Sequence, residues 1–168
     1  MKPEDFRQRF IAALPPTPPA LDLELDDFIQ FAPSQLTRYE LDSIEHHLPS
    51  GVGFPAQAAP YLSFGAWRGR SDWVPQDFFP FGSDGGEGII CIGIASHNIV
   101  LVDNDCISAR PTYVNASLIT FAECLCIYAE HWTRRRMEGC FQQMCGVDAS
   151  LSELGQWWLT QTQQSRVQ

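Results

Sequence analysis

Four carboxylates near a glycine-rich turn are the side chains of this sequence whose spacing could support chemistry. They are Asp84, Glu87, Asp103 and Asp105. Carboxylates gathered in this way can ligate calcium. The spacing of a calcium-binding helix–loop–helix is absent, since only Asp103-Asn104-Asp105 is locally suggestive and no Glu closes a loop behind it. A strand hairpin with acidic ends is therefore favoured over a metal site.

The turn itself reads GSDGGEG and resembles a phosphate-binding loop only superficially. It lacks the Lys-Ser/Thr ending of such a loop and the spacing of a dinucleotide-binding fingerprint, and two carboxylates would repel phosphate. The glycines Gly82, Gly85 and Gly86 are expected to serve the backbone of the turn, because glycine tolerates a positive φ. Ser83 and Asp84 can accept hydrogen bonds from the backbone close by.

The remaining reactive side chains do not form a catalytic constellation. The adjacent His46 and His47 point in different directions on a helix and have no second ligand pair. The six cysteines form no CxxC pair and no zinc spacing, and we expect buried free thiols: Cys91, Cys106, Cys124, Cys126, Cys140 and Cys145. The sequence therefore predicts no enzyme, no cofactor and no bound metal.

Charge is unevenly distributed along the chain, whose formal net charge is −9 over 168 residues. The segment Ser71–Ala109 has six acids and no Lys or Arg, and Ala20–Ser50 has seven acids against Arg38. The part from Cys106 onward is neutral, with five acids and five Arg. Direct binding of nucleic acid would need a basic surface, so we expect no direct binding of nucleic acid. The acidic surface serves either solubility alone or the binding of a basic protein, and the sequence does not separate the two.

The sequence pattern predicts helices at both ends of the chain. Residues 3–14 and 22–31 read as helices, Thr37 and Glu40 have the spacing of a capping box, and residues 56–64 fit a short helix. The strongest helical period runs from Leu118 to Trp132, with Arg134–Arg136 in its last turn and Gly139 just past its end. Ser150 and Glu153 form a second capping-box pair at the start of a final helix.

Strands are expected in the middle of the chain, at Phe78–Phe81, Gly88–Ile94, Ile99–Asp103 and Thr112–Val114. Their short connections favour an antiparallel meander. The fold class is therefore α+β, a twisted antiparallel sheet of about four to six strands packed with N- and C-terminal helices. Residues 1–168 are expected to form a single domain, in which residues 1–19 are an N-terminal helix and a Pro-rich extension. With no signal peptide or membrane span in the pattern, a cytoplasmic location is expected.

The segment Trp73–Asp105 resembles the SMI1/KNR4, or SUKH, superfamily. A Trp precedes a strand of the PFG type, Phe79–Gly82, and a turn rich in Ser, Gly and Asp follows. The apolar strand Ile89–Ile94 and the strand Ile99–Asp103, which ends in acids, complete the block. The segment Leu41–Pro55 looks like the helix and Leu-Pro step of that superfamily, and Ser117–Leu125 looks like its late helix.

The resemblance implies a SUKH-like α+β domain that acts by binding. For bacterial members it implies immunity to a toxin from a contact-dependent or polymorphic toxin system, and many such toxins are basic nucleases. The alternative is a general interaction or regulatory scaffold, as eukaryotic members of the superfamily resemble. Monomer and homodimer both remain open.

The residues expected to contact a partner combine acids with exposed tryptophans, as at a protein interface steered by charge. The competing interpretation is that the aromatic residues close the ends of the core. The expected contacts are Trp67, Asp72, Trp73, Asp84, Glu87, Asp103 and Asp105.

Overall fold

The computed structural model describes residues 3–14, 57–58, 62–64, 73–86, 88–103 and 110–164. The helices expected at residues 22–31 and after Thr37 lie outside these residues. Six strands form one antiparallel sheet in sequence order, which confirms the α+β class and the predicted meander. The strands are β1 (Gln57–Ala58), β2 (Leu62–Phe64), β3 (Phe78–Ser83), β4 (Gly88–Gly93), β5 (Ile99–Asp103) and β6 (Thr112–Asn115).

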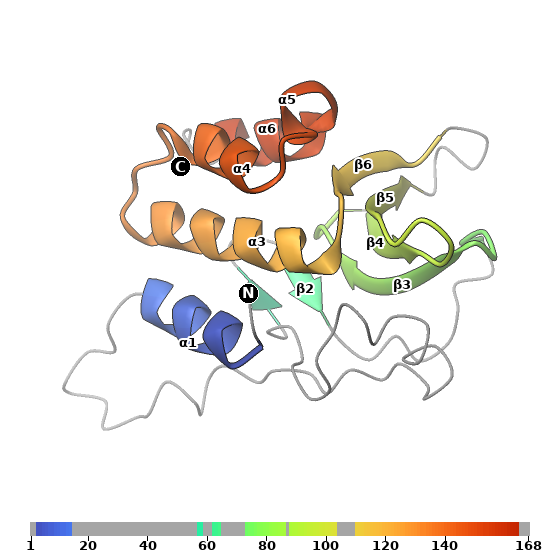
Figure 1. Ribbon diagram of the computed structural model, residues 1–168, viewed down its shortest axis with the longest axis horizontal. Helices are drawn as coiled ribbons and strands as arrows, with labels where there is room; N and C mark the ends of the chain where they lie inside the picture. Colours follow the sequence, from blue (N-terminus) through green and yellow to red (C-terminus); the bar gives the residue numbers. More distant parts are fainter. Residues whose placement is uncertain are drawn as a thin grey trace.

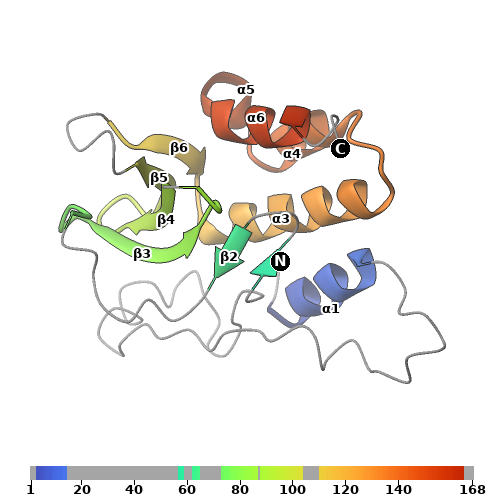
Figure 2. The same ribbon diagram turned by 180° about the vertical axis from the view of Figure 1, so that it is seen from behind.

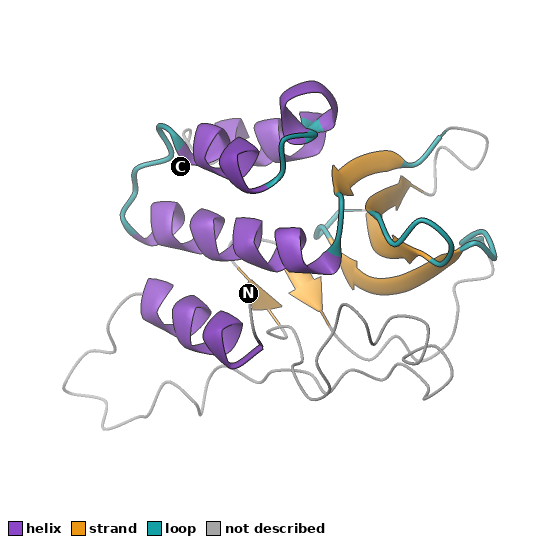
Figure 3. Cartoon of the chain, viewed as in Figure 1, coloured by secondary structure: helices purple, strands orange, loops and turns teal. Residues whose placement is uncertain are grey.

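Helix α3 (Leu118–Thr133) is the centre of the helical part. Figure 1 shows α1 (Pro3–Ala13) along one side of it, the C-terminal helices along the other and the sheet at one end, and Figure 2 shows this arrangement from behind. The C-terminal helices are α4 (Cys140–Val147), α5 (Leu151–Leu154) and α6 (Gln156–Gln164). The segregation of helices from strands is plain in Figure 3 and is typical of an α+β protein.

The sheet carries apolar residues on both faces. Successive side chains of a strand point to opposite faces, so Ile90 and Ile92 of β4 face the helices while Ile89 and Cys91 face away from them. We call these the helix face and the opposite face. The helix face belongs to the main core, and the opposite face holds a smaller cluster of Val74, Ile89, Cys91 and Val102. This explains why all of β4 is buried and why its sequence is continuously apolar.

Aromatic rings join the sheet to the helices. The ring centroid of Phe121 in α3 lies 5.8 Å from those of Phe64 in β2 and Phe81 in β3, and 6.0 Å from that of Trp158 in α6. Gly82 lies within β3, so its expected place in the turn was wrong. A Cβ at Gly82 would lie 2.6 Å from a ring carbon of Phe64, so this glycine leaves room for a ring rather than for a turn.

A buried polar network links β6 to the C-terminal helices through Asp148, which follows α4 and is 4% exposed. Its Oδ2 accepts hydrogen bonds from Tyr113 Oη at 3.0 Å, from Asn115 Nδ2 at 3.1 Å and from the backbone N–H of Ala116 at 2.8 Å. The fully buried Asn115 in turn accepts a bond from Trp158 Nε1 at 2.9 Å. Buried polar groups that are satisfied in this way specify one arrangement of the elements they join.

Several predicted elements differ from the structure near their ends. Residues 56–64 contain strands β1 and β2 instead of a short helix, because Gln57 and Ala58 pair antiparallel with Ser63 and Leu62. The long helix ends at Thr133, before the arginines, with Arg135 at φ 52°. Gly139, at φ 76°, precedes α4, a helix that the sequence pattern did not predict.

The final helix is divided at Gly155, and the predicted capping box is not formed, since the side chain of Ser150 makes no capping bond. Instead, the backbone N–H of Ser150 donates to Asp148 Oδ1 at 3.1 Å. Within the described helices a capping box is formed at α3, where Ser117 and Thr120 bond each other's backbone.

Candidate functional site

The β3–β4 turn is built by its own polar side chains. Ser83 Oγ accepts a hydrogen bond from the backbone N–H of Gly85 at 3.2 Å, and Asp84 Oδ1 accepts one from the N–H of Gly86 at 3.0 Å. Gly85 has φ 80°, a conformation that strains most other residues. The structure therefore places Gly85 and Gly86 in the turn, and it fixes Asp84 by one of its two oxygens.

Asp84 and Asp103 lie at the same end of the sheet, on either side of Gly88. The backbone N–H of Asp84 donates to the carbonyl oxygen of Gly88 at 3.3 Å, and Gly88 pairs with Asp103 across β4 and β5. Asp103 and Leu101 are two positions apart on β5 and so point to the same face of the sheet, and Leu101 packs against the main core, which places Asp103 on the helix face. Gly88 of β4 shares a face with Ile90, and a Cβ at Gly88 would lie 2.8 Å from Asp84 Oδ2, so the carboxylate of Asp84 lies on the helix face as well. The structure thus brings two of the expected contact residues together.

Trp73, the third expected contact residue that the structure describes, lies elsewhere. It is half-buried and packs against the small cluster of the opposite face. At Trp73 the structure therefore supports a packing role for the ring, on the face of the sheet opposite to that of Asp84. The other expected contacts, Trp67, Asp72, Glu87 and Asp105, lie outside the described residues.

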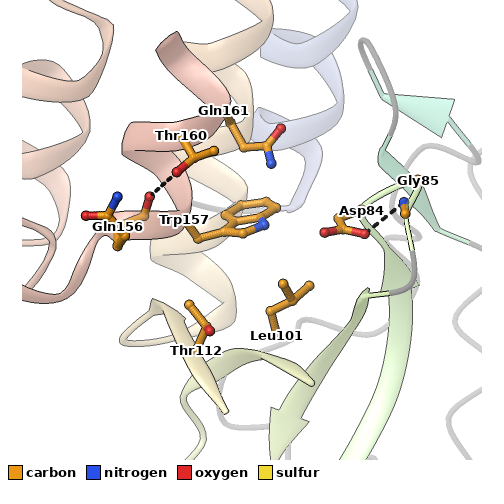
Figure 4. Close-up of a pocket in the computed structure, with 9 residues that line it drawn as sticks. Asp84, Gly85, Leu101, Thr112, Gln156, Trp157, Thr160 and Gln161 are labelled. Atoms are coloured by element: carbon orange, nitrogen blue, oxygen red, sulfur yellow. Dashed lines mark hydrogen bonds between the residues drawn. The ribbon is translucent and has the colours of Figure 1, made fainter. Parts of the chain in front are cut away.

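An open pocket of about 560 Å³ separates the β3–β4 turn from α6. Asp84 stands on one wall and Trp157 on the other, with Leu101 of β5 between them, as Figure 4 shows. The other lining residues are Gly85, Gly86, Thr112, Gln156, Thr160 and Gln161. The hydroxyl of Thr160 donates to the backbone oxygen of Gln156 at 2.9 Å, so this wall is a regular helical surface.

Trp157, in α6, was not among the residues that the sequence analysis expected to contact a partner. It is 6% exposed, and its ring lies 4.7 Å from that of Trp158 between centroids. Its Nε1 is nevertheless the one buried side-chain nitrogen or oxygen without a hydrogen-bond partner among the described residues. Whether the indole N–H has a partner depends on which groups the fold places around the ring, so no sequence signal could have identified this unpaired N–H.

The cysteines offer no activated nucleophile in the part of the chain that the structure describes. Burial raises the pKa of Cys91, Cys124, Cys126 and Cys140 to about 12, and the pKa of Cys145 is also raised by burial. These cysteines are free thiols, four of them buried, which agrees with the prediction, while Cys106 lies outside the described residues. A thiol with a raised pKa is protonated at neutral pH and is a poor nucleophile.

The described residues hold no group of three or more His, Cys, Asp or Glu side chains that could bind a metal ion. Of the four acids considered for calcium, Asp84 and Asp103 are described. The pocket presents one fixed carboxylate, one unpaired indole N–H and the apolar side chain of Leu101. No helix within the described ranges is long and apolar enough to span a membrane.

The comparison with protein families gives a match to the model described as SUKH-4 immunity protein, over residues 7–144. No curated protein and no solved structure gives a significant match. The matched residues make up most of the chain and include α1 from residue 7 onward, the whole sheet, α3 and α4 as far as Met144. The resemblance noted in the sequence is confirmed, and the chain belongs to the SUKH-4 immunity protein family of the SMI1/KNR4 superfamily, which supports an immunity role against a toxin.

Proposed function

We propose that this chain acts in the cytoplasm by binding a basic toxin domain, a nuclease, and covering the surface with which that domain would contact nucleic acid. Membership of an immunity protein family supports a toxin as the partner. The choice of a basic toxin rests on one observation, the gathering of acids at the β3–β4 end of the sheet. Protection by this route is stoichiometric, because the toxin is occluded and not chemically altered.

The charge of the proposed surface comes from Asp84 and Asp103. From Ser71 to Ser117 the sequence has six acids and, as its single Lys or Arg, Arg110. Arg110 is exposed two residues before β6 and offsets part of the negative charge near Asp103. Asp84 lies on the other side of Gly88, within the pocket, and is the better anchor for a cation.

A nuclease needs a basic surface in order to bind the phosphate backbone. An acidic protein that docks on this surface competes with nucleic acid for the same cations, and opposite charges also accelerate the encounter. Affinity for such a toxin should therefore fall as salt rises. Asp72, Glu87, Asp105 and Trp67 remain proposed contacts, whereas Trp73, on the opposite face, is not part of this docking surface.

The test is co-purification of the chain with the product of the adjacent gene, followed by survival of cells that express that product with and without this chain. We expect a stable complex and protection that requires the chain. Failure to bind and to protect against any neighbouring toxin would show the proposal to be wrong. Capture of many unrelated proteins without a toxin would favour the scaffold function instead.

Two double charge reversals test the position of the surface. Asp84→Arg with Asp103→Arg is expected to weaken toxin binding at least about tenfold, because like charges then meet at the interface. Glu138→Arg with Glu153→Arg is the matched control, since both residues are exposed, lie in the helical part and change the net charge equally. Equal effects of the two pairs would show that net charge, not this surface, controls binding. Thermal melts establish that all variants fold.

A further inference from the structure

The neighbouring tryptophans of α6 differ in one respect that burial does not explain. Trp158 is fully buried and its indole N–H donates to Asn115 Oδ1 at 2.9 Å. Trp157 is 6% exposed, and its indole N–H has no partner. An unpaired buried donor destabilises a protein, and such exceptions call for an explanation such as an absent ligand.

The unpaired nitrogen of Trp157 faces a carboxylate across the pocket. Figure 4 shows the nitrogen on the side of the ring turned toward Asp84, with Leu101 beneath both. Asp84 Oδ1 already accepts a bond from the turn, and the carboxylate keeps further acceptor capacity. The pocket thus presents one fixed donor and one fixed anion, with an apolar floor between them.

We propose that this pocket receives one basic side chain of the toxin, whose cation pairs with the carboxylate of Asp84 while a main-chain carbonyl oxygen of the same residue accepts the N–H of Trp157. This inference rests on the proposed function. A basic residue supplies both missing partners, a cation for the carboxylate and an acceptor for the indole. Its methylene groups can lie on Leu101 and on the ring of Trp157, as long charged side chains do on apolar surface.

Other occupants fit these groups less well. An anion would be repelled by Asp84, although it would accept from Trp157. An apolar side chain would bury both polar groups without a partner. A neutral amide could bond both groups, but it would leave the carboxylate charge uncompensated. The cation is therefore the feature that the test must isolate.

Two single variants of the whole chain isolate the two contacts. Their affinity for the purified adjacent toxin, made inactive by mutation, is measured by calorimetry. Asp84→Asn keeps the shape and the bond to the turn but removes the charge. Trp157→Phe keeps a buried ring but removes the N–H. We expect the first to weaken binding at least about tenfold and the second about fivefold, as for the loss of one charged and one neutral hydrogen bond.

Trp158→Phe and Asp103→Asn are the matched controls. The first removes an indole N–H that already has an internal partner, so it should lower the melting temperature and leave the affinity nearly unchanged at a temperature where the variant is folded. The second removes a carboxylate at the same end of the sheet that does not line the pocket. A smaller loss of affinity for Asp103→Asn than for Asp84→Asn supports the pocket as the binding site of the cation.

The outcomes separate this inference from the proposed function. If the unaltered chain binds no toxin, the proposed function fails first. If it binds and neither Asp84→Asn nor Trp157→Phe weakens the complex, the pocket is not the seat of a toxin residue. If only Trp157→Phe weakens the complex, the proposal of a cation in the pocket is wrong. If only Asp84→Asn weakens it, the proposed hydrogen bond of Trp157 is wrong. Dissociation of a homodimer by either variant, with toxin binding unchanged, would assign the pocket to a second copy of this chain.

A small probe keeps the inference testable if Trp157→Phe does not fold. N-acetyl-arginine N-methylamide carries the cation and the carbonyl, and its citrulline counterpart has the same shape without the charge. We expect the arginine compound to shift the indole N–H resonance of Trp157 saturably and the citrulline compound to shift it at least about fivefold less. Equal shifts, or no shift from either compound, would overturn the inference.

Discussion

Replacement of Asp148 by Ala should destabilise the fold far more than a surface carboxylate would. In the structure one oxygen of Asp148 accepts hydrogen bonds from Tyr113, Asn115 and Ala116, and the other accepts one from Ser150. Because a buried donor that loses its partner costs about 1–3 kcal/mol and such costs do not add fully, we expect a total loss of about 3–5 kcal/mol. This is a large part of the roughly 5–15 kcal/mol that stabilises a typical domain.

Asp148→Asn gives a graded comparison at the same position. The amide oxygen can replace Oδ2 and keep the three bonds from β6 and its neighbours, but the amide N–H₂ then meets the N–H of Ser150. Two donors cannot bond each other, so this variant should lose about 1–2 kcal/mol. From the most to the least stable, the expected order is therefore the unaltered chain, Asp148→Asn and Asp148→Ala.

The assay is urea unfolding followed by circular dichroism, with the free energy of unfolding extrapolated to water. Glu138→Ala, at an exposed position between α3 and α4, should stay within about 0.5 kcal/mol of the unaltered chain. A double-mutant cycle with Asn115→Ala should give a coupling energy of about 1–3 kcal/mol, since Asn115 and Asp148 share a direct bond. A loss below about 1 kcal/mol for Asp148→Ala, or no coupling, would refute the reasoning.

The remaining predictions concern glycines and thiols. Gly155→Ala should lower the free energy of unfolding by about 1–3 kcal/mol, because the new Cβ would lie 2.5 Å from the backbone oxygen of Leu151. Gly146→Ala in α4, where a Cβ would meet nothing within 4 Å, should raise it by roughly 0.5 kcal/mol. Urea unfolding that finds the same sign for both variants would contradict this. In a Cys106→Ser background, a thiol reagent should label Cys145 before unfolding and the four buried thiols only afterwards; early labelling of a buried thiol would contradict the packing. Those four thiols have pKa values raised from 9.0 to about 12, so the folded state holds their protons more tightly than the unfolded state does: Cys91, Cys124, Cys126 and Cys140. Their stabilising contribution is complete below about pH 9 and is lost as pH rises toward 12, by about 2 kcal/mol per thiol at about pH 10.5. Between about pH 8 and 10.5, Cys91→Ala should therefore lose less stability than the unaltered chain does in the same unfolding assay.

Much of the sheet and of the central helix follows from local pattern. The strand Ile99–Asp103 was predicted at its observed bounds, and the strand beginning at Gly88 ends one residue earlier than expected. The helix from Leu118 was predicted because its apolar period is long. The ends were less predictable. The backbone N–H groups of Arg134–Arg136 bond carbonyl oxygens of the last turn of α3 while the helix itself ends at Thr133, and the N–H of Ser150 bonds Asp148 where a capping box was expected.

The candidate site was only partly predictable. Sequence reasoning selected Asp84 because acids and glycines in a turn are a local signal, and it grouped Asp84 with Asp103 and Trp73 by proximity along the chain. The structure keeps the first two together and places Trp73 on the opposite face, because alternate positions and strand register decide the face. Trp157, more than seventy positions later, was not associated with the site at all.

The sequence by itself determined the fold class, the antiparallel order of the strands, the family and the concentration of acids near the β3–β4 turn. These depend on period, turn residues and composition, which are local properties of the chain. The tertiary structure alone decided that α6 brings Trp157 opposite Asp84, that Gly82 makes room for the ring of Phe64, and that Asp148 joins β6 to the C-terminal helices. Those contacts join residues far apart in sequence, and only packing of the whole core fixes which of them meet.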